Sequence, residues 1–230
     1  MWLLNSSVGR KVVMSVTGVA LILFLTFHML MNLVALVSTE GYNWVCEFLG
    51  ANWYAVAGTL VLAALFIIPI LYAFWLTLQN RKARGSERYA VVRKPKTVEW
   101  SSQNMLVLGL IVIVGIGLHL VNFWSRMMLP ELMEQAGAHV SPHTLLLSGD
   151  GIYHIEQTFS NPLFALLYLV WLVALWFHMN HGFWSAMQTL GWNNKLWLRR
   201  WQVISNIYST LICICFALVV VTFYIRSLIQ

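Results

Sequence analysis

The feature that most constrains this chain is a set of five apolar stretches, each long enough to cross a lipid bilayer. A membrane-spanning helix needs about 20 mostly apolar residues. The stretches cover residues 12–37, 54–79, 104–128, 162–187 and 203–227. Of the 230 residues, 60% are hydrophobic and 10% are charged, whereas a soluble domain has about 25% charged residues. The sequence therefore predicts an all-α fold, with residues 1–230 forming one polytopic membrane domain of five transmembrane helices.

The charged residues divide between the two sides of the predicted bundle. Twelve of the fourteen lysines and arginines precede the first span or lie in the connections 80–103 and 188–202. Six of the eight acids lie in the other two connections, 38–53 and 129–161. By the positive-inside rule, this asymmetry predicts a multi-pass protein of the inner (cytoplasmic) membrane, with a cytoplasmic N-terminus and an outer C-terminus. Because the net charge of +6 lies in loops between spans, it does not indicate nucleic-acid binding.

Four histidines lie inside the spans, where a polar side chain is costly unless it has a partner. Since a helix rises about 1.5 Å per residue, the depth of each can be estimated from the sequence. His28 lies sixteen residues after Val12, and His119 lies fifteen residues after Asn104, on helices of the same direction. These two histidines are therefore expected at one level in the outer half. His178 is expected in the inner half, with His181 about one turn deeper.

Two histidines at matched depth in a helical bundle suit bis-imidazole ligation of a haem iron. Gly18, Gly115 and Gly117 would leave room for a porphyrin near these ligands, although glycine in a membrane helix also permits close helix packing. An alternative is that each histidine only hydrogen-bonds a neighbouring helix. Zinc is less suitable because it needs clustered ligands, and no acidic residue lies in the five spans.

Four segments together resemble the cytochrome b membrane subunit of succinate:quinone and quinol:fumarate oxidoreductases. They are GRKVVMSVTGVALILFLTFHMLMNLV, LTLQNRKARGSERYAV, GLHLVNFW and FHMNHGFWSAMQTLGWNN. The resemblance is to the single-subunit, five-helix kind that holds two b haems. It implies that His28 and His119 are the axial ligands of the outer (distal) haem. It implies that His178 ligates the inner (proximal) haem and that His181 is a neighbour of haem or quinone.

The second span departs from the family pattern. The position expected to supply its haem ligand is Pro69, and residues 54–79 contain neither histidine nor methionine. Proline cannot ligate iron and is expected to kink the helix. The inner haem would then be five-coordinate through His178, bound by a shifted residue such as His181, or missing. Because His178 and its flanking motif are intact, an altered inner haem is favoured over its loss.

The resemblance also implies a function. The chain would be the membrane anchor and electron-transfer subunit of a complex with a flavoprotein subunit and an iron–sulfur subunit, which exchange electrons with a membrane quinone. Five-helix relatives commonly use menaquinone, and the whole complex can form a dimer. The chain has no nucleotide-binding motif and is not expected to act on succinate or fumarate itself. Its inner basic loops are candidate docking sites for the partner subunits.

Glu47 and Trp44 are candidate quinone residues, because a quinone site needs a polar group beside an apolar slot. Glu47 is the acidic residue expected to lie nearest the outer haem. An alternative role for Trp44 is that of an interfacial aromatic. Two other functions remain open: the b-type cytochrome anchor of a hydrogenase or formate dehydrogenase, and a haem-free membrane anchor or transporter.

Overall fold

The computed structural model describes residues 6–50, 52–84 and 100–229, in which every regular element is a helix. Among these residues, five helices are long and apolar enough to span a membrane, as predicted. They are α2 (Ser7–Val37), α4 (Trp53–Arg84), the continuous run of α6 (Met105–His119), η1 (Leu120–Trp124) and α7 (Ser125–Gln135), α10 (Pro162–Thr189), and α11 (Lys195–Ile229). Each run extends past its predicted apolar span at one end or at both. A further short helix, α5 (Trp100–Gln103), precedes α6.

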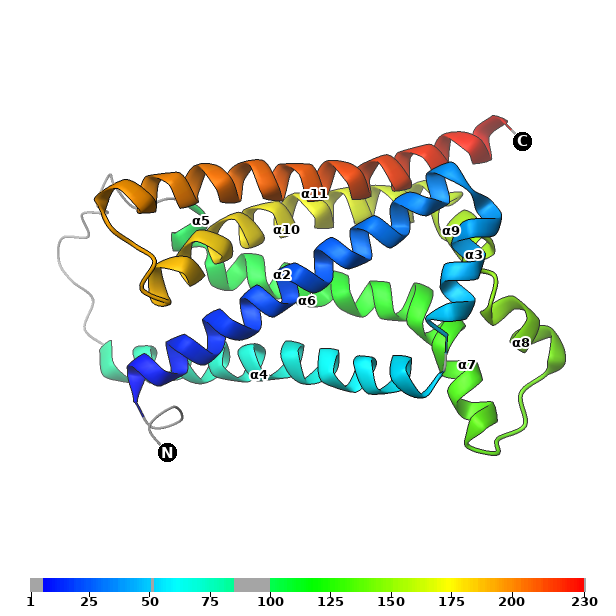
Figure 1. The fold of residues 1–230 in the computed structure, drawn as a ribbon, viewed down its shortest axis with the longest axis horizontal. Helices are drawn as coiled ribbons and strands as arrows, with labels where there is room; N and C mark the ends of the chain where they lie inside the picture. The colour runs from blue at the N-terminus through cyan, green and yellow to red at the C-terminus, as the bar shows by residue number, and fades with distance from the viewer. Residues whose placement is uncertain (1–5, 51, 85–99, 230) are drawn as a thin grey trace.

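The spanning helices lie side by side along the long axis of the molecule (Figure 1). Helix α10 packs against α2, α6 and α11, whereas α4 packs chiefly against α2. None of the side chains described in α4 is buried. This helix also continues through Pro69 from Trp53 to Arg84. The second span is therefore the least enclosed element of the bundle.

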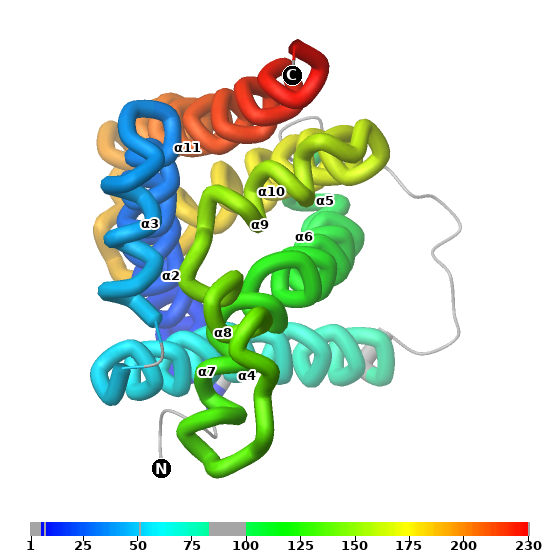
Figure 2. The backbone as a smooth tube through the Cα atoms, turned by 90° about the vertical axis from the view of Figure 1, so that its right-hand side faces the viewer, coloured from blue at the N-terminus to red at the C-terminus, as the bar shows by residue number. Residues whose placement is uncertain are grey.

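Short helices cover one end of the bundle (Figure 2). They are α3 (Thr39–Phe48), α8 (Pro142–Ser148) and α9 (Gly151–Phe159). Local capping explains where two of them begin. The Ser38 hydroxyl accepts a hydrogen bond from the Gly41 amide at 2.9 Å, and the Asp150 carboxylate accepts one from the Tyr153 amide at 3.0 Å. Such side chains satisfy amides that have no partner inside the helix.

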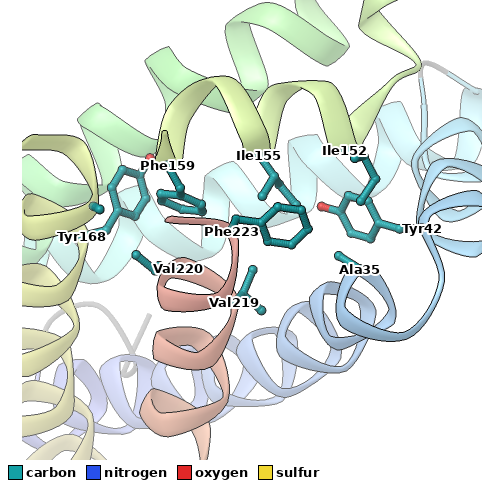
Figure 3. Close-up of a cluster of buried hydrophobic side chains, with 10 residues drawn as sticks. Ala35, Tyr42, Ile152, Ile155, Phe159, Tyr168, Val219, Val220 and Phe223 are labelled. Carbon is teal, nitrogen blue, oxygen red and sulfur yellow. The ribbon is translucent and has the colours of Figure 1, made fainter. Parts of the chain in front are cut away.

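The largest buried cluster joins these short helices to the spans (Figure 3). Its centre is Phe223 of α11 and Ile155 of α9, which are both almost fully buried. The other buried members are Ala35, Tyr42, Ile152, Phe159, Ala165, Tyr168, Val219 and Val220. Because they come from α2, α3, α9, α10 and α11, their packing fixes the short helices on the end of the bundle.

Hydrogen bonds between polar side chains hold α10 against α11. The Ser205 hydroxyl donates to Asn180 Oδ1 at 2.7 Å. The Trp176 indole donates to the Thr210 hydroxyl at 2.9 Å. Between helices that lipid surrounds, apolar burial supplies little driving force, and close packing with hydrogen bonds takes its place. These contacts help to hold α10, which carries His178, in one register.

The two ends of the bundle differ in charge, as the sequence predicts. At the end opposite the short helices (Figure 1), the described basic residues lie at the start of α2, in the last turns of α4 and at the start of α11. They include Arg10, Lys11, Arg81, Lys82, Lys195, Arg199 and Arg200. Helices α3, α7 and α9 carry acidic side chains. Arg88, Arg93, Lys94 and Lys96 lie outside the described residues.

Asn43 links α3 to the start of α9. Its amide donates to Asp150 Oδ1 at 2.9 Å, and its carbonyl oxygen accepts from the Ile152 amide at 3.0 Å. Cys46 lies one turn further along α3, against Gly151. Burial raises the pKa of the Cys46 thiol to about 11, so the thiol stays protonated and poorly reactive.

The Asn43→Ala variant is expected to loosen the junction between α3 and α9. It leaves the amide of the buried Ile152 without its partner, which costs about 1–3 kcal/mol. Maleimide labelling of Cys46, followed by peptide mass spectrometry, should be faster than in the original protein. Asn52→Ala is the control, because the Asn52 amide bonds only the exposed carbonyl of Phe48 among the described residues. Equal labelling in both variants would show that Asn43 does not fix this junction.

Candidate functional site

The structure brings the imidazole rings of His28 of α2 and His119 of α6 into edge contact inside the bundle. The centroids of their imidazole rings are 5.7 Å apart, and the ring planes are nearly perpendicular at 85°. The residues are 91 positions apart in the sequence. The predicted match in depth between the two histidines is thus realised as a direct contact. Their role as metal ligands stays a prediction.

The separation of the two rings can be compared with what a shared metal requires. An imidazole nitrogen binds a first-row metal at about 2 Å, and the ring centroid lies about 1 Å behind that nitrogen. Two imidazoles on opposite sides of one metal therefore have centroids about 6 Å apart. The observed 5.7 Å is close to this value. Both side chains are also neutral nitrogen donors, the type of ligand that haem iron accepts.

Neither imidazole ring forms a close hydrogen bond with a described residue. The Asn32 amide approaches the two ring nitrogens of His28 only at 3.5 Å, the outer limit for such a bond, and donates instead to the His28 carbonyl at 2.8 Å. Tyr42 donates to Asn32 Oδ1 at 3.3 Å, which anchors this amide. Among the described residues, no hydrogen bond to the ring of His119 is formed. The donor set therefore fits an axial pair.

Aromatic side chains pack around the two half-buried imidazoles. On the His28 side, Phe24 and Phe216 lie with ring centroids 5.6 and 5.7 Å from the imidazole. On the His119 side, Phe123 and Trp171 lie at 5.1 and 6.0 Å. Such an environment lowers the local dielectric constant, which is one of the means by which proteins tune a bound redox group.

The glycines near the pair have two different roles. At Gly18 and Gly117, a Cβ atom would meet no other atom within 4 Å, and Gly117 lies on an exposed face of α6. At Gly115, a Cβ atom would overlap the indole of Trp171. That indole donates to the carbonyl of Val112 at 3.2 Å. Gly115 therefore provides space for a tryptophan of α10, a role that the sequence did not predict.

A π-helical turn, η1, follows His119 directly and was not predicted. Such turns insert an extra residue into an α-helix and often occur at functional sites. Within η1, Asn122 is 2% exposed and its amide donates to the Tyr168 hydroxyl at 3.3 Å. The Tyr168 ring in turn lies 6.3 Å from that of His119. An asparagine in an apolar stretch was the signal available in the sequence, because such a residue needs a polar partner.

The inner histidines lie apart from this pair, on α10. The edge of the His178 ring approaches α6 at Gly109, where a Cβ atom would lie 3.5 Å from His178 Cε1. His178 Nδ1 is buried and has no hydrogen-bond partner in the described part of the chain. His181 contacts Trp184 edge to face, with centroids 4.8 Å apart. Among the described residues, no second imidazole faces His178 in the way that His119 faces His28.

The candidate quinone residues occupy an exposed face of α3. Glu47 is exposed, and Trp44 is 63% exposed and stacks on Phe48 with centroids 5.5 Å apart. Glu47 therefore belongs to a separate short helix and not to the start of the second span. Its neighbour Asn43 is engaged in the junction with α9. A quinone role for Glu47 and Trp44 stays a prediction.

The remaining candidate metal ligands do not gather. The thiols of Cys46, Cys213 and Cys215 are free, in agreement with a packing role. Across the described residues, no three His, Cys, Asp or Glu side chains come together as a metal site would require. The facing pair of His28 and His119 is thus the most distinctive arrangement of potential ligands in the described structure. Comparisons of the chain with protein families, with curated proteins and with solved structures find no match.

Proposed function

We propose that this chain is a b-type cytochrome, the membrane anchor and electron-transfer subunit of a succinate:quinone or quinol:fumarate oxidoreductase. The observation that carries the proposal is the facing pair His28 and His119. Their ring centroids lie 5.7 Å apart inside a bundle of apolar helices. The four sequence segments that resemble this family support the more specific assignment to a complex.

In this proposal His28 and His119 hold one haem b through their imidazole nitrogens. Haem b supplies reversible one-electron chemistry when it is bound. Asn32 and Tyr42 position the helix around His28 through their hydrogen bonds. Phe24, Phe123, Phe216 and Trp171 pack around the site. These residues thus provide ligation, orientation and an apolar environment.

We further propose His178 as the axial ligand of a second, inner haem. Its buried Nδ1 has no hydrogen-bond partner among the described residues, and the adjacent Gly109 leaves α6 without a side chain there. Because Pro69 cannot supply the opposite ligand, the chain would provide one imidazole at this site. Such a centre is expected to be high-spin, unlike the bis-imidazole site.

The charge distribution supports a membrane orientation and a docking surface for this function. The end that carries Arg10, Arg81 and Lys195 is proposed to face the cytoplasm, and Lys195, Arg199 and Arg200 are exposed there. An iron–sulfur subunit bound at this end would lie on the same side as His178. The quinone, proposed to be menaquinone, would reach the complex from the surrounding lipid. Succinate or fumarate chemistry is assigned to the flavoprotein partner.

The proposal is tested by the dithionite-reduced minus oxidised absorption spectrum of the purified chain, with haem quantified per polypeptide. Two haems per chain are expected. The His178→Ala variant is expected to lose one haem and to keep the bis-imidazole signal, because its histidine belongs only to the inner site. One haem that this variant leaves unchanged would contradict the inner site, and a colourless protein would overturn the proposed function.

Isolation of the intact complex separates this function from other respiratory cytochromes. A flavin-bearing subunit and an iron–sulfur subunit should co-purify with the chain from its native membrane. Co-purification with a hydrogenase or a formate dehydrogenase would keep the cytochrome assignment and reject the named complex. Arg199→Glu combined with Arg200→Glu should weaken the association if this end docks the partner.

A further inference from the structure

A cleft lies at the end of the bundle that carries the short helices, and none of the four histidines of the spans lines it. Its volume is about 320 Å³. It lies between α7, α8 and α9 and is lined by Ser125, Arg126, Pro130, Thr144, Leu147, Tyr153, His154 and Gln157. The lining thus combines one guanidinium group with hydroxyl and amide groups. The proposed electron transfer involves none of the residues that line this cleft.

Arg126 is the cationic group of the cleft. It is exposed and forms no ion pair or hydrogen bond with any described residue. It follows Met105, the first residue of α6, by 21 positions, which corresponds to about 30 Å of helix. The hydrocarbon core of a bilayer is also about 30 Å thick. Arg126 therefore stands at the level of the lipid head groups.

His154 forms a buried wall of the same cleft. It is only 4% exposed, and its Nε2 lies 2.9 Å from the carbonyl oxygen of Leu147. Since a carbonyl oxygen only accepts, Nε2 carries the proton. Burial and then the charge of Arg126 lower the pKa of His154, although its bond to Leu147 opposes this shift. The neutral ring has an acceptor, Nδ1, without a partner among the described residues.

The surroundings favour a lipid phosphate over a phosphate dissolved in water. Six acidic residues lie on the connections at this end, namely Glu40, Glu47, Glu131, Glu134, Asp150 and Glu156. Their combined field repels a free anion that approaches from solution. A phospholipid is held at the right height by its acyl chains, so its phosphate group reaches Arg126 from the side.

We propose that the cleft between α7, α8 and α9 binds the head group of an anionic phospholipid, with Arg126 pairing with the phosphate. Arginine suits this role because its planar guanidinium can donate two hydrogen bonds to one phosphate. The hydroxyl of Thr144 and the amide of Gln157 provide further polar groups in the lining. The unpartnered Nδ1 of His154 favours a head group that carries hydroxyl donors, such as glycerol, which would reach this buried atom after nearby side chains shift. The site is independent of any haem.

The test uses native mass spectrometry of the detergent-solubilised chain, titrated with phosphatidylglycerol. Arg126→Gln is expected to weaken binding of the first lipid about fivefold or more, because an arginine near the membrane surface contributes about 1 kcal/mol. Arg226→Gln is the matched control. Arg226 lies near the opposite end of α11 from Lys195 and packs over Phe223 at 5.1 Å. Gln157→Ala should weaken binding less than Arg126→Gln.

Three outcomes would overturn the proposal. Unchanged lipid binding in Arg126→Gln would show that Arg126 does not pair with the phosphate. Equal losses in Arg126→Gln and Arg226→Gln would show that net charge, and not the cleft, retains the lipid. Displacement of phosphatidylglycerol by inorganic phosphate would assign the cleft to a soluble anion. Preserved tryptophan fluorescence and an unchanged unfolding midpoint would show that each variant is folded.

Discussion

Replacing His119 by alanine is expected to abolish the bis-imidazole site, so that the purified chain loses its low-spin haem signal. His119 faces His28 in the described structure, and without it only one imidazole is left at this site. Its nearest aromatic neighbours, Phe123, Tyr168 and Trp171, cannot replace it as a neutral nitrogen donor. Haem quantification and the low-temperature electron paramagnetic resonance spectrum measure this loss.

The design of this experiment distinguishes loss of a ligand from loss of the fold. His28→Ala should give the same loss of the low-spin signal as His119→Ala, and the double variant should lose the outer haem itself, since both residues bind one iron. His139→Ala is the control, because His139 is exposed in the connection between α7 and α8. If His119→Ala keeps its low-spin haem signal while the control is unaffected, the bis-imidazole assignment is wrong.

Gly115→Ala is expected to be the most destabilising small substitution in the spans. The new Cβ would overlap the Trp171 indole, which also donates to the carbonyl of Val112 at 3.2 Å. Accommodating an extra methyl group in a closely packed site typically costs about 1–3 kcal/mol. Because Trp171 lies 6.0 Å from His119, its displacement should also reduce haem occupancy. The unfolding midpoint in detergent, followed by tryptophan fluorescence, measures the first effect.

Gly117→Ala is the matched control for this prediction. It is two residues away in the same helix, and its new Cβ would meet no atom within 4 Å. Both variants gain the same helix propensity, about 1 kcal/mol in water, so their difference isolates the overlap with Trp171. Equal unfolding midpoints would show that Trp171 can move away without cost and that Gly115 is not required for its packing.

Most of the fold could be predicted from hydropathy because every backbone amide must be bonded inside the segment in lipid. A long apolar run then has few options other than a helix. The five spans and the helical start at Pro162 follow from this rule, and Asn161 caps that start by accepting from the Leu163 amide at 2.9 Å. Helices α3 and α8 were not predicted. Short helices in water are marginal on their own, so tertiary packing on the bundle decides whether they form.

The candidate site was only partly predictable, because tertiary packing decides part of it too. Depth along a helix follows from residue number, so His28 and His119 could be placed at one level. Which face of each helix carries its histidine depends on packing between helices, which residue numbers do not give. The exposed position of Glu47 shows this difference, because the sequence placed it near the second span whereas the structure places it on the outward face of α3.

The sequence by itself determined that the chain is a five-helix membrane protein, which of its ends is basic, and which histidines share a depth. These properties depend on local composition and on a fixed rise per residue. Only the tertiary structure decided that His28 and His119 face each other, that Trp171 occupies the space at Gly115, and that Arg126 opens into a cleft beside His154. These relationships depend on the rotation and tilt of whole helices. Packing and hydrogen bonds between segments far apart in the chain set that rotation and tilt.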